Sequence, residues 1–140
     1  DSHLKVRTTF YDRFGNTLTS SNFEQNDLVV IKVSIQSLDD TEVENVAITD
    51  IVPACFEIEN PRISPNRDME WIKDQDHPDY MDIRDDRISF FTDAARIPKN
   101  FYYMIRVVSK GSYKMGPVSA DAMYDGQYHS YWGGKTVVVR

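Results

Sequence analysis

Apolar and polar side chains alternate with a period of two along most of this chain, and that alternation limits the fold more than any other feature. In segment 4–11 (LKVRTTFY), Leu4, Val6 and Phe10 fall on one side and the charged residues on the other. Segment 28–37 repeats the pattern with an unbroken face of β-branched side chains. Neighbouring side chains of a β-strand point to opposite faces, whereas a helix repeats about every 3.6 residues. The chain is therefore expected to consist of half-buried strands.

Turn-forming residues separate the alternating segments. Gly15, Gly111 and the pair Gly116-Pro117 mark turns, and Pro53 cannot donate to a strand ladder. Many short strands with frequent turn signals are typical of antiparallel sandwiches. We predict an all-β, immunoglobulin-like antiparallel β-sandwich of about seven to nine strands, folded as a single domain over residues 1–140. The expected strands cover residues 4–11, 28–37, 43–52, 56–58, 87–92, 101–109, 113–115, 118–124 and 136–139.

The alternation is lost between residues 64 and 86. We expect an inserted and mostly irregular connection there. Asp68 is suited to cap one or two turns of helix near 68–76, and the pair His77-Pro78 would end them.

The charge of the chain argues against two classes of partner. Lys and Arg number 16 against 22 Asp and Glu, which leaves a net charge of −6. A nucleic acid or an anionic membrane would require a basic surface that this composition does not supply. The longest apolar runs, such as 28–31 and 137–139, are far shorter than the roughly 20 residues that span a bilayer. No nucleic-acid partner and no direct membrane insertion are expected.

The histidines and the cysteine show no catalytic or metal-binding pattern. His3, His77 and His129 are not spaced as metal ligands, and the chain has no nucleophile elbow. Cys55, the single cysteine, begins a string that resembles the Cys-x-Glu-Gln of an internal thioester, but Ile58 stands where the glutamine must be. We predict a small buried or half-buried thiol, no catalytic residues, no cofactor and no metal site of the usual patterns.

An acidic stretch over residues 74–86 offers the oxygen ligands that Ca²⁺ prefers. Its order departs from the EF-hand loop, since Pro78 occupies a ligand position and Asp79 the position of the obligatory glycine. We interpret the stretch as solvated loop charge that is partly paired with Arg84 and Arg87. Calcium binding there remains the alternative.

Aromatic side chains gather near the end of the chain. Tyr124, Tyr128, Tyr131 and Trp132 fall within nine residues, and glycines flank them. Such residues anchor protein interfaces or stack on sugars, but a loop that packs on itself against one end of the sandwich fits the pattern equally well. One reading of the whole chain is therefore a stand-alone β-sandwich module that binds carbohydrate or protein through this loop.

Four segments together resemble a known family, the C-terminal macroglobulin-like domain of bacterial alpha-2-macroglobulins, which are protease-trapping endopeptidase inhibitors. They cover nearly the whole chain in family order, and the strings DIRDDR and A-MYD are their most specific parts. The segments are 4–15 (LKVRTTFYDRFG), 46–61 (VAITDIVPACFEIENP), 80–91 (YMDIRDDRISFF) and 101–125 (FYYMIRVVSKGSYKMGPVSADAMYD).

This resemblance implies a macroglobulin-like fold and a noncatalytic role. In the family the domain docks on sister domains of the same polypeptide, notably the thioester-type domain, and meets target proteases only through the parent protein. It also implies a periplasmic or cell-envelope location, with membrane anchoring through the N-terminal part of the parent.

The resemblance further assigns candidate site residues. The resemblance implies that the Met-Tyr pair of the family's AMYD loop, here Met123 and Tyr124, shields the thioester from water and amines. Gly126 stands where the family often has proline, which would loosen the loop. The other residues of the candidate contact loop are Asp125, Tyr128, Tyr131 and Trp132.

Overall fold

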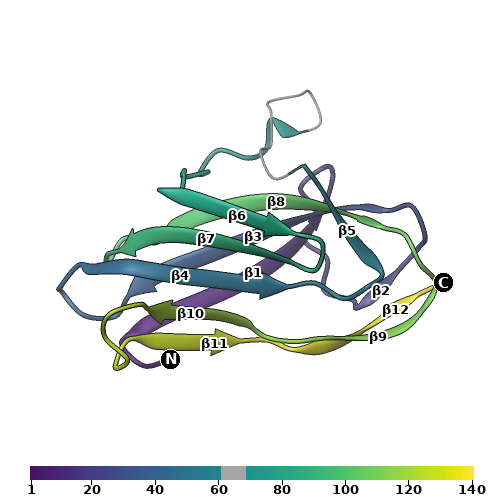
Figure 1. Cartoon of the computed structure of the whole chain (residues 1–140). Coiled ribbons are helices and arrows are strands. Elements are labelled where there is room, and N and C mark those ends of the chain that lie inside the picture. The colour runs from purple at the N-terminus through teal and green to yellow at the C-terminus, as the bar shows by residue number, and fades with distance from the viewer. Residues whose placement is uncertain (61–68) are drawn as a thin grey trace.

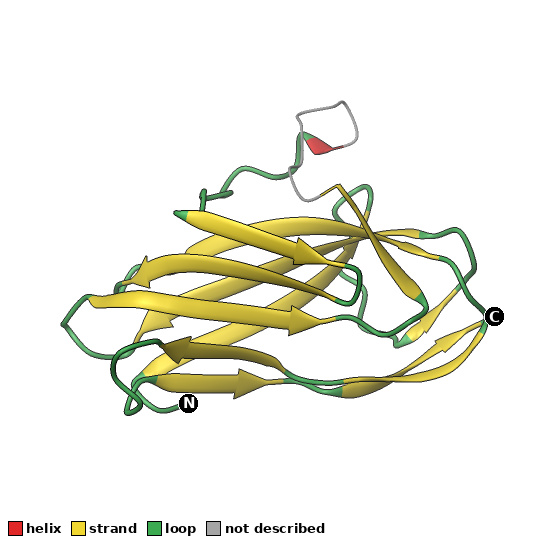
Figure 2. Cartoon of the chain, viewed as in Figure 1, coloured by secondary structure: helices red, strands yellow, loops and turns green. Residues whose placement is uncertain are grey.

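A computed structural model of the chain describes residues 1–60 and 69–140 (Figure 1). Within these residues the chain forms strands joined by loops, and only Met69 is assigned a helical conformation (Figure 2). The described residues contain no helix that is long and apolar enough to cross a membrane.

Two sheets face each other to form the sandwich, and a third, smaller sheet lies at one end (Figure 1). The four-stranded sheet has the order β1 (Leu4–Asp12), β3 (Leu28–Ser37), β8 (Lys99–Val107) and β5 (Phe56–Asn60). The five-stranded sheet has the order β11 (His129–Trp132), β10 (Val118–Ala122), β4 (Val43–Ile51), β7 (Arg87–Ala94) and β6 (Tyr80–Arg84). The small sheet contains β2 (Asn22–Phe23), β12 (Lys135–Val139) and β9 (Gly111–Met115).

Neighbouring strands pair antiparallel in both large sheets, and their inward side chains form one core. The predicted alternation is confirmed in β1, where Leu4, Val6 and Phe10 are buried. Phe90 of β7 stacks on Phe101 of β8 across the sandwich, with ring centroids 5.2 Å apart. The predicted all-β sandwich is therefore confirmed.

The described residues form twelve strands, which is more than the seven to nine predicted. Strand β2 has two residues, which is too short to show alternation. Strand β6 is an edge strand whose residues are all exposed or half-exposed, and its apolar face consists only of Met81 and Ile83, which is too short an alternation to stand out among the surrounding acidic residues. Strand β11 has only one buried residue, Ser130, and its aromatic side chains gave the appearance of a loop.

The connection between β5 and β6 differs from the expectation in two ways. Residues 80–84 form a regular strand rather than an irregular loop. Asp68, the expected helix cap, lies outside the described residues, and the described part of that segment has no helix beyond Met69.

Residues 69–76 instead cover the outer face of the four-stranded sheet. Trp71 packs against Tyr11 and Tyr102, with ring centroids 5.1 and 6.3 Å away, and its indole N–H donates to the carbonyl of Arg13 at 2.9 Å. Asp74 accepts hydrogen bonds from the Tyr102 hydroxyl at 2.5 Å and from Lys32 at 3.0 Å. These contacts with distant strands determine the path of the segment and override its local helix signals.

Cys55 is completely buried, as predicted. Burial raises the pKa of its thiol. Its carbonyl accepts the N–H of Val108 at 2.8 Å, so the residue is part of the junction between β5 and the end of β8.

Candidate functional site

The turn that joins β10 to β11 carries the most exposed aromatic side chain among the described residues, Tyr124, at 84% exposure. The adjacent Met123 is 50% exposed. Two large, mostly apolar side chains thus project from one turn at the edge of the five-stranded sheet. We call residues 123–128 the presenting turn.

Backbone hydrogen bonds hold the base of the presenting turn. The N–H of Ala122 donates to the carbonyl of Tyr128 at 2.9 Å, and the N–H of Tyr128 donates to the carbonyl of Asp125 at 3.1 Å. The N–H of Met123 donates to the carbonyl of Asn45 at 2.9 Å, which ties the turn to β4. The backbone that carries the exposed pair is therefore fixed from both sides.

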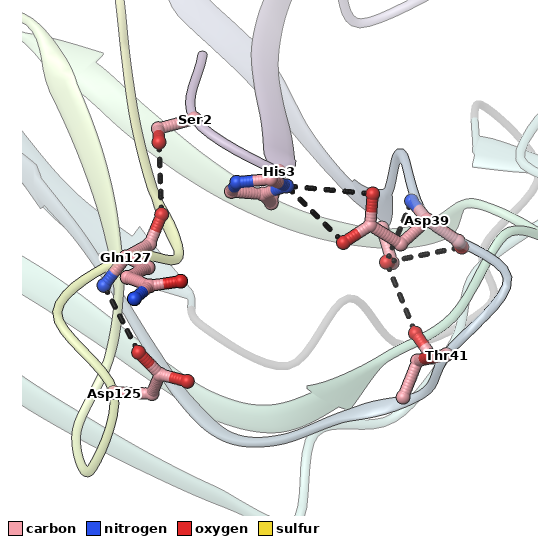
Figure 3. A network of polar contacts seen from close by, with 7 residues as sticks. Ser2, His3, Asp39, Thr41, Asp125 and Gln127 are labelled. Atoms are coloured by element: carbon pink, nitrogen blue, oxygen red, sulfur yellow. Dashed lines mark hydrogen bonds and ion pairs between the residues drawn. The ribbon is translucent and has the colours of Figure 1, made fainter.

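Polar side chains secure the other limb of the turn (Figure 3). The Asp125 carboxylate accepts the N–H of Gln127 at 3.1 Å, a local bond typical of Asx turns. The Gln127 carbonyl in turn accepts the hydroxyl of Ser2 at 2.8 Å. His3 lies beside Asp39 at 3.2 Å, at the start of the loop that faces the presenting turn. The first residues of the chain thus belong to the support of the site.

A β-bulge in β4 sets the position of Asn45. The pairing of β4 with β7 shifts register between Val43 and Val46, and Asn45 adopts a positive φ of 56°. Asparagine tolerates this left-handed conformation better than most residues. The N–H of Asn45 donates to the Asp93 carboxylate at 3.0 Å, while its carbonyl accepts from Met123. Bulges commonly redirect the chain beside functional sites. This bulge directs the Asn45 carbonyl toward the presenting turn, where it accepts the N–H of Met123.

A hollow of about 350 Å³ lies beside Tyr124, between the presenting turn and the β3–β4 loop. Glu42, Glu44 and Asp125 give its wall a negative charge. A surface that docks against Tyr124 would meet three carboxylates here, so a cationic partner residue is favoured over an anionic one. The lining residues are Thr41, Glu42, Val43, Glu44, Asn45, Ala122, Tyr124, Asp125 and Tyr128.

Tyr128 has a different environment from Tyr124. It is half-buried, packs against the main core, and lies 5.1 Å from the His3 ring. Burial, together with the nearby Asp39 carboxylate, raises the pKa of its phenol. The structure thus places Tyr128 among the supporting contacts of the turn.

Tyr131 and Trp132 lie on β11 rather than on the expected loop, which corrects the sequence-based expectation. They are adjacent residues of a strand, so their side chains leave opposite faces and do not form one flat platform. The Arg7 guanidinium lies over the Trp132 ring at 4.2 Å and is held by Asp1 at 2.8 Å. Tyr131 remains 57% exposed on the outer side.

Gly126 does not need the conformational freedom of glycine. It has no positive φ, and a Cβ placed there would have nothing within 4 Å. The expected loosening of the loop is offset by the hydrogen bonds at its base, including one between the Gly126 carbonyl and the His129 ring at 3.2 Å.

The carboxylates of the 74–86 stretch are distributed among separate partners. Arg84 lies 3.3 Å from Asp82 and Arg87 lies 3.1 Å from Asp86, which confirms the pairing expected from the sequence. Among the described residues there is no group of three or more His, Cys, Asp or Glu side chains arranged to hold a metal ion.

Two features of the site escaped the sequence analysis. The acidic wall formed by Glu42 and Glu44 comes from the β3–β4 loop and the start of β4, about 80 residues earlier in the chain, and no local pattern links it to Tyr124. The sequence contains one weak indication of the bulge at Asn45, because a residue that tolerates positive φ interrupts an otherwise regular strand.

The fold and the matched sequence define a macroglobulin-type domain. A family model described as the bacterial alpha-2-macroglobulin MG10 domain matches residues 4–127, a range that includes most of the presenting turn. The chain therefore belongs to the bacterial alpha-2-macroglobulin MG10 domain family.

Curated relatives agree with this assignment. The chain is 26% identical to an alpha-2-macroglobulin homolog of Yersinia pestis over 155 aligned positions, which cover 94% of this chain and 7% of that protein. It is also 26% identical to an alpha-2-macroglobulin of Pasteurella multocida, over 91% of this chain and 6% of that protein. The chain thus spans less than a tenth of the length of these relatives.

Solved structures share the fold. The segment of native Escherichia coli alpha-2-macroglobulin from domain MG7 to the C-terminus matches with a TM-score of 0.87 at 20% identity, over 99% of this chain and 23% of that one. Salmonella alpha-2-macroglobulin reacted with methylamine matches with a TM-score of 0.85 at 21% identity, over 98% and 9%.

Proposed function

We propose that this chain is a noncatalytic C-terminal domain of a longer protease-trapping protein of the alpha-2-macroglobulin type, and that it docks on sister domains through the presenting turn. The observation that supports this most directly is the geometry of Met123 and Tyr124. They project into solvent from a backbone that is bonded to β4 and to the start of the chain. A rigid turn with exposed apolar side chains loses little conformational entropy when a partner covers it.

The Met-Tyr pair is suited to cover a reactive acyl centre in the parent. A thioether adapts to an irregular surface, and a phenol ring excludes water on its face while its hydroxyl keeps a hydrogen bond. Full burial of such side chains contributes on the order of 2 kcal/mol each before the costs of association are subtracted. We therefore propose that Met123 and Tyr124 lie over the thioester of the sister domain and limit the access of water and amines.

The proposal includes the cellular setting. A protease-trapping parent would act in the periplasm or cell envelope, anchored outside this domain, and would meet proteases through its other domains. In this proposal the chain itself contributes contact and positioning and performs no reaction.

Amine reactivity of the parent protein tests the shielding role. In a thioester-containing parent, Tyr124→Ala should increase the rate of methylamine-induced thiol release about tenfold or more, since about 1.4 kcal/mol of lost protection corresponds to a factor of ten. Tyr124→Phe should stay near the native rate, because the ring still covers the centre. Tyr131→Ala is the matched control, as Tyr131 is also an exposed tyrosine near the turn but lies on β11. An unchanged rate in Tyr124→Ala would contradict the shielding role.

A further inference from the structure

The two long sides of the sandwich are unequal. On one side β1 packs beside β10 and β11, so the sheets are closed against each other. On the other side, β6 ends the five-stranded sheet and β5 ends the four-stranded sheet; among residues 1–60 and 69–140, β6 pairs only with β7 and β5 only with β8 (Figure 1). The outer edge of β6 is therefore unpaired by any described strand, on the side of its sheet opposite to the presenting turn.

Two hollows follow this open side. One has a volume of about 540 Å³ and reaches the stacked rings of Phe90 and Phe101. The other has a volume of about 450 Å³ and lies between β5 and the β6–β7 turn. Ile83 of β6 lines both of them, so the hollows are neighbours along the same strand. Together they form what we call the β6 groove.

The register of β6 determines what its free edge offers. Arg84 pairs with Arg87 across the two-residue turn, and hydrogen-bonded pairs alternate along an antiparallel ladder. The backbone groups of Met81 and Ile83 therefore point away from β7, toward the edge of the sheet with which no described strand pairs. The side chains of the same two residues face the buried Phe90 and Ile88. A strand added at this edge would find both backbone partners and apolar side-chain positions at alternate residues.

The acidic side chains around the β6 groove favour a basic binding partner. Asp79 lines the first hollow, and Glu57 and Asp85 line the second. None of the described residues makes a hydrogen bond or ion pair with the side chains of these three, whereas Asp82 and Asp86 are already paired with arginines. Edge-to-edge pairing with a second copy would bring like charges together and is disfavoured. An extended segment that carries Lys or Arg between apolar residues complements the groove.

We propose that β6 accepts an extended segment of the parent polypeptide as an added strand, with apolar side chains in the β6 groove and basic side chains against Asp79, Asp85 and Glu57. The proposal rests on the proposed function insofar as it requires a parent longer than this chain. A segment tethered in the same polypeptide has a high effective concentration, so even weak intrinsic pairing is sufficient. This second contact surface is separate from the presenting turn.

Hydrogen exchange in the full-length parent, followed at single-residue resolution, tests the added strand. The amides of Met81 and Ile83 should exchange about tenfold or more slowly than freely exposed amides, because they would donate to the added strand. Asp85→Lys should speed their exchange by a similar factor and leave Tyr80 and Asp82 protected by β7. Asp121→Lys is the matched control, since Asp121 is an exposed aspartate of the same sheet on a distant strand. Free exchange at Met81 and Ile83 in the native parent would overturn the proposal.

Cross-linking identifies the occupant. Within residues 1–140 the single native thiol, Cys55, is buried, so Asp85→Cys adds one accessible site for a cysteine-reactive cross-linker, and the unsubstituted parent is the control for thiols elsewhere in the polypeptide. The expected product joins position 85 to a Lys- or Arg-bearing segment of the same polypeptide outside residues 1–140. A product that joins two copies of residues 1–140, or an acidic segment, would overturn the proposal.

The roles proposed for the two docking surfaces can be disproved independently of each other. If Tyr124→Ala speeds methylamine reaction while Met81 and Ile83 exchange freely, the presenting turn retains its role and the added strand is excluded. If those amides are protected and Tyr124→Ala has no effect, the added strand stands and the shielding role is excluded.

Discussion

Asp50 is the residue whose environment departs most from the rest of the core. It is 1% exposed, and its carboxylate accepts a hydrogen bond from the Tyr103 hydroxyl of the opposite sheet at 2.5 Å. Burial raises the pKa of Asp50 from 3.8 to about 6, while the Tyr103 hydrogen bond and the charge of Lys135 act in the opposite direction. Burial also lowers the pKa of Lys135, which lies over the Phe10 ring at 3.6 Å. The hydrogen bond between Asp50 and Tyr103 thus joins the two sheets through a carboxyl group that titrates.

This link predicts how stability depends on pH. Between pH 3.8 and about 6 the folded state binds a proton at Asp50 that the unfolded state has lost. The contribution of Asp50 to the free energy of unfolding therefore falls by about 3 kcal/mol as the pH rises through this window. Asp50→Asn, which keeps an acceptor for Tyr103, should remove that slope. Urea unfolding of both proteins at several pH values between 4 and 7 measures it, and parallel pH profiles would refute the assignment.

Gly15 shows a second constraint at the scale of one residue. Its φ is 92°, and a Cβ there would lie 2.7 Å from the indole ring of Trp71. Gly15→Ala should therefore destabilise the chain by about 1–3 kcal/mol, through backbone strain and displacement of the ring. Gly126→Ala is the control, because a Cβ at Gly126 meets nothing within 4 Å. Urea unfolding followed by tryptophan fluorescence gives both values, and equal stability of the two variants would contradict this account.

At the scale of elements, the bulge of β4 and the presenting turn form one unit. Asn45 has a positive φ and carries the carbonyl that holds Met123. A β-branched side chain is poorly tolerated in this conformation.

Asn45→Val should therefore cost about 1–2 kcal/mol of stability and loosen the turn, whereas Asn45→Gly keeps the conformation accessible. The amide of Met123 reports the loosening, and its hydrogen exchange should accelerate only in the valine variant. Slow exchange at Met123 in Asn45→Val would show that the turn is held without the bulge.

The strands that the sequence predicted best have one face of apolar side chains and an opposite face that is more polar. Strand β3 was predicted with its exact bounds, because β-branched residues fill its inner face. Strand β6 was missed because its apolar face has only two residues, both half-exposed or exposed, and the path of residues 69–76 was missed because Trp71 and Asp74 contact residues far away in the sequence. The Met-Tyr pair was found through family resemblance. The roles of Asn45 and of the acidic wall could be identified only from the structure, which shows how β4 pairs with β7 and where the loops lie.

At the scale of the whole molecule, the surfaces proposed for docking are separate from the contacts that stabilise the fold. The outer face of the four-stranded sheet is covered by the chain itself, through Met69, Trp71 and Ile72. Tyr124, by contrast, is 84% exposed and contributes to no core cluster.

Tyr124→Ala should consequently change the stability of the chain by no more than about 0.5 kcal/mol, the range typical of exposed substitutions. Thermal or urea unfolding of the 140-residue chain measures the change. A loss of several kcal/mol would mean that Tyr124 supports the fold, and its effect in the parent would then require a different explanation.

The attachment of the first residues to the presenting turn has a mechanical consequence. Ser2 exchanges backbone hydrogen bonds with His129 at 2.7 and 3.0 Å, and its hydroxyl bonds to Gln127. Tension applied to the chain at Ser2 would load these few bonds before it reached the long ladders of β1 and β3. The presenting turn would then lose the support of Ser2 on the limb that contains Gln127, while its bond to Asn45 and the ladders of the sandwich stayed intact, so a pull on the first residues would act on the turn before it acted on the core.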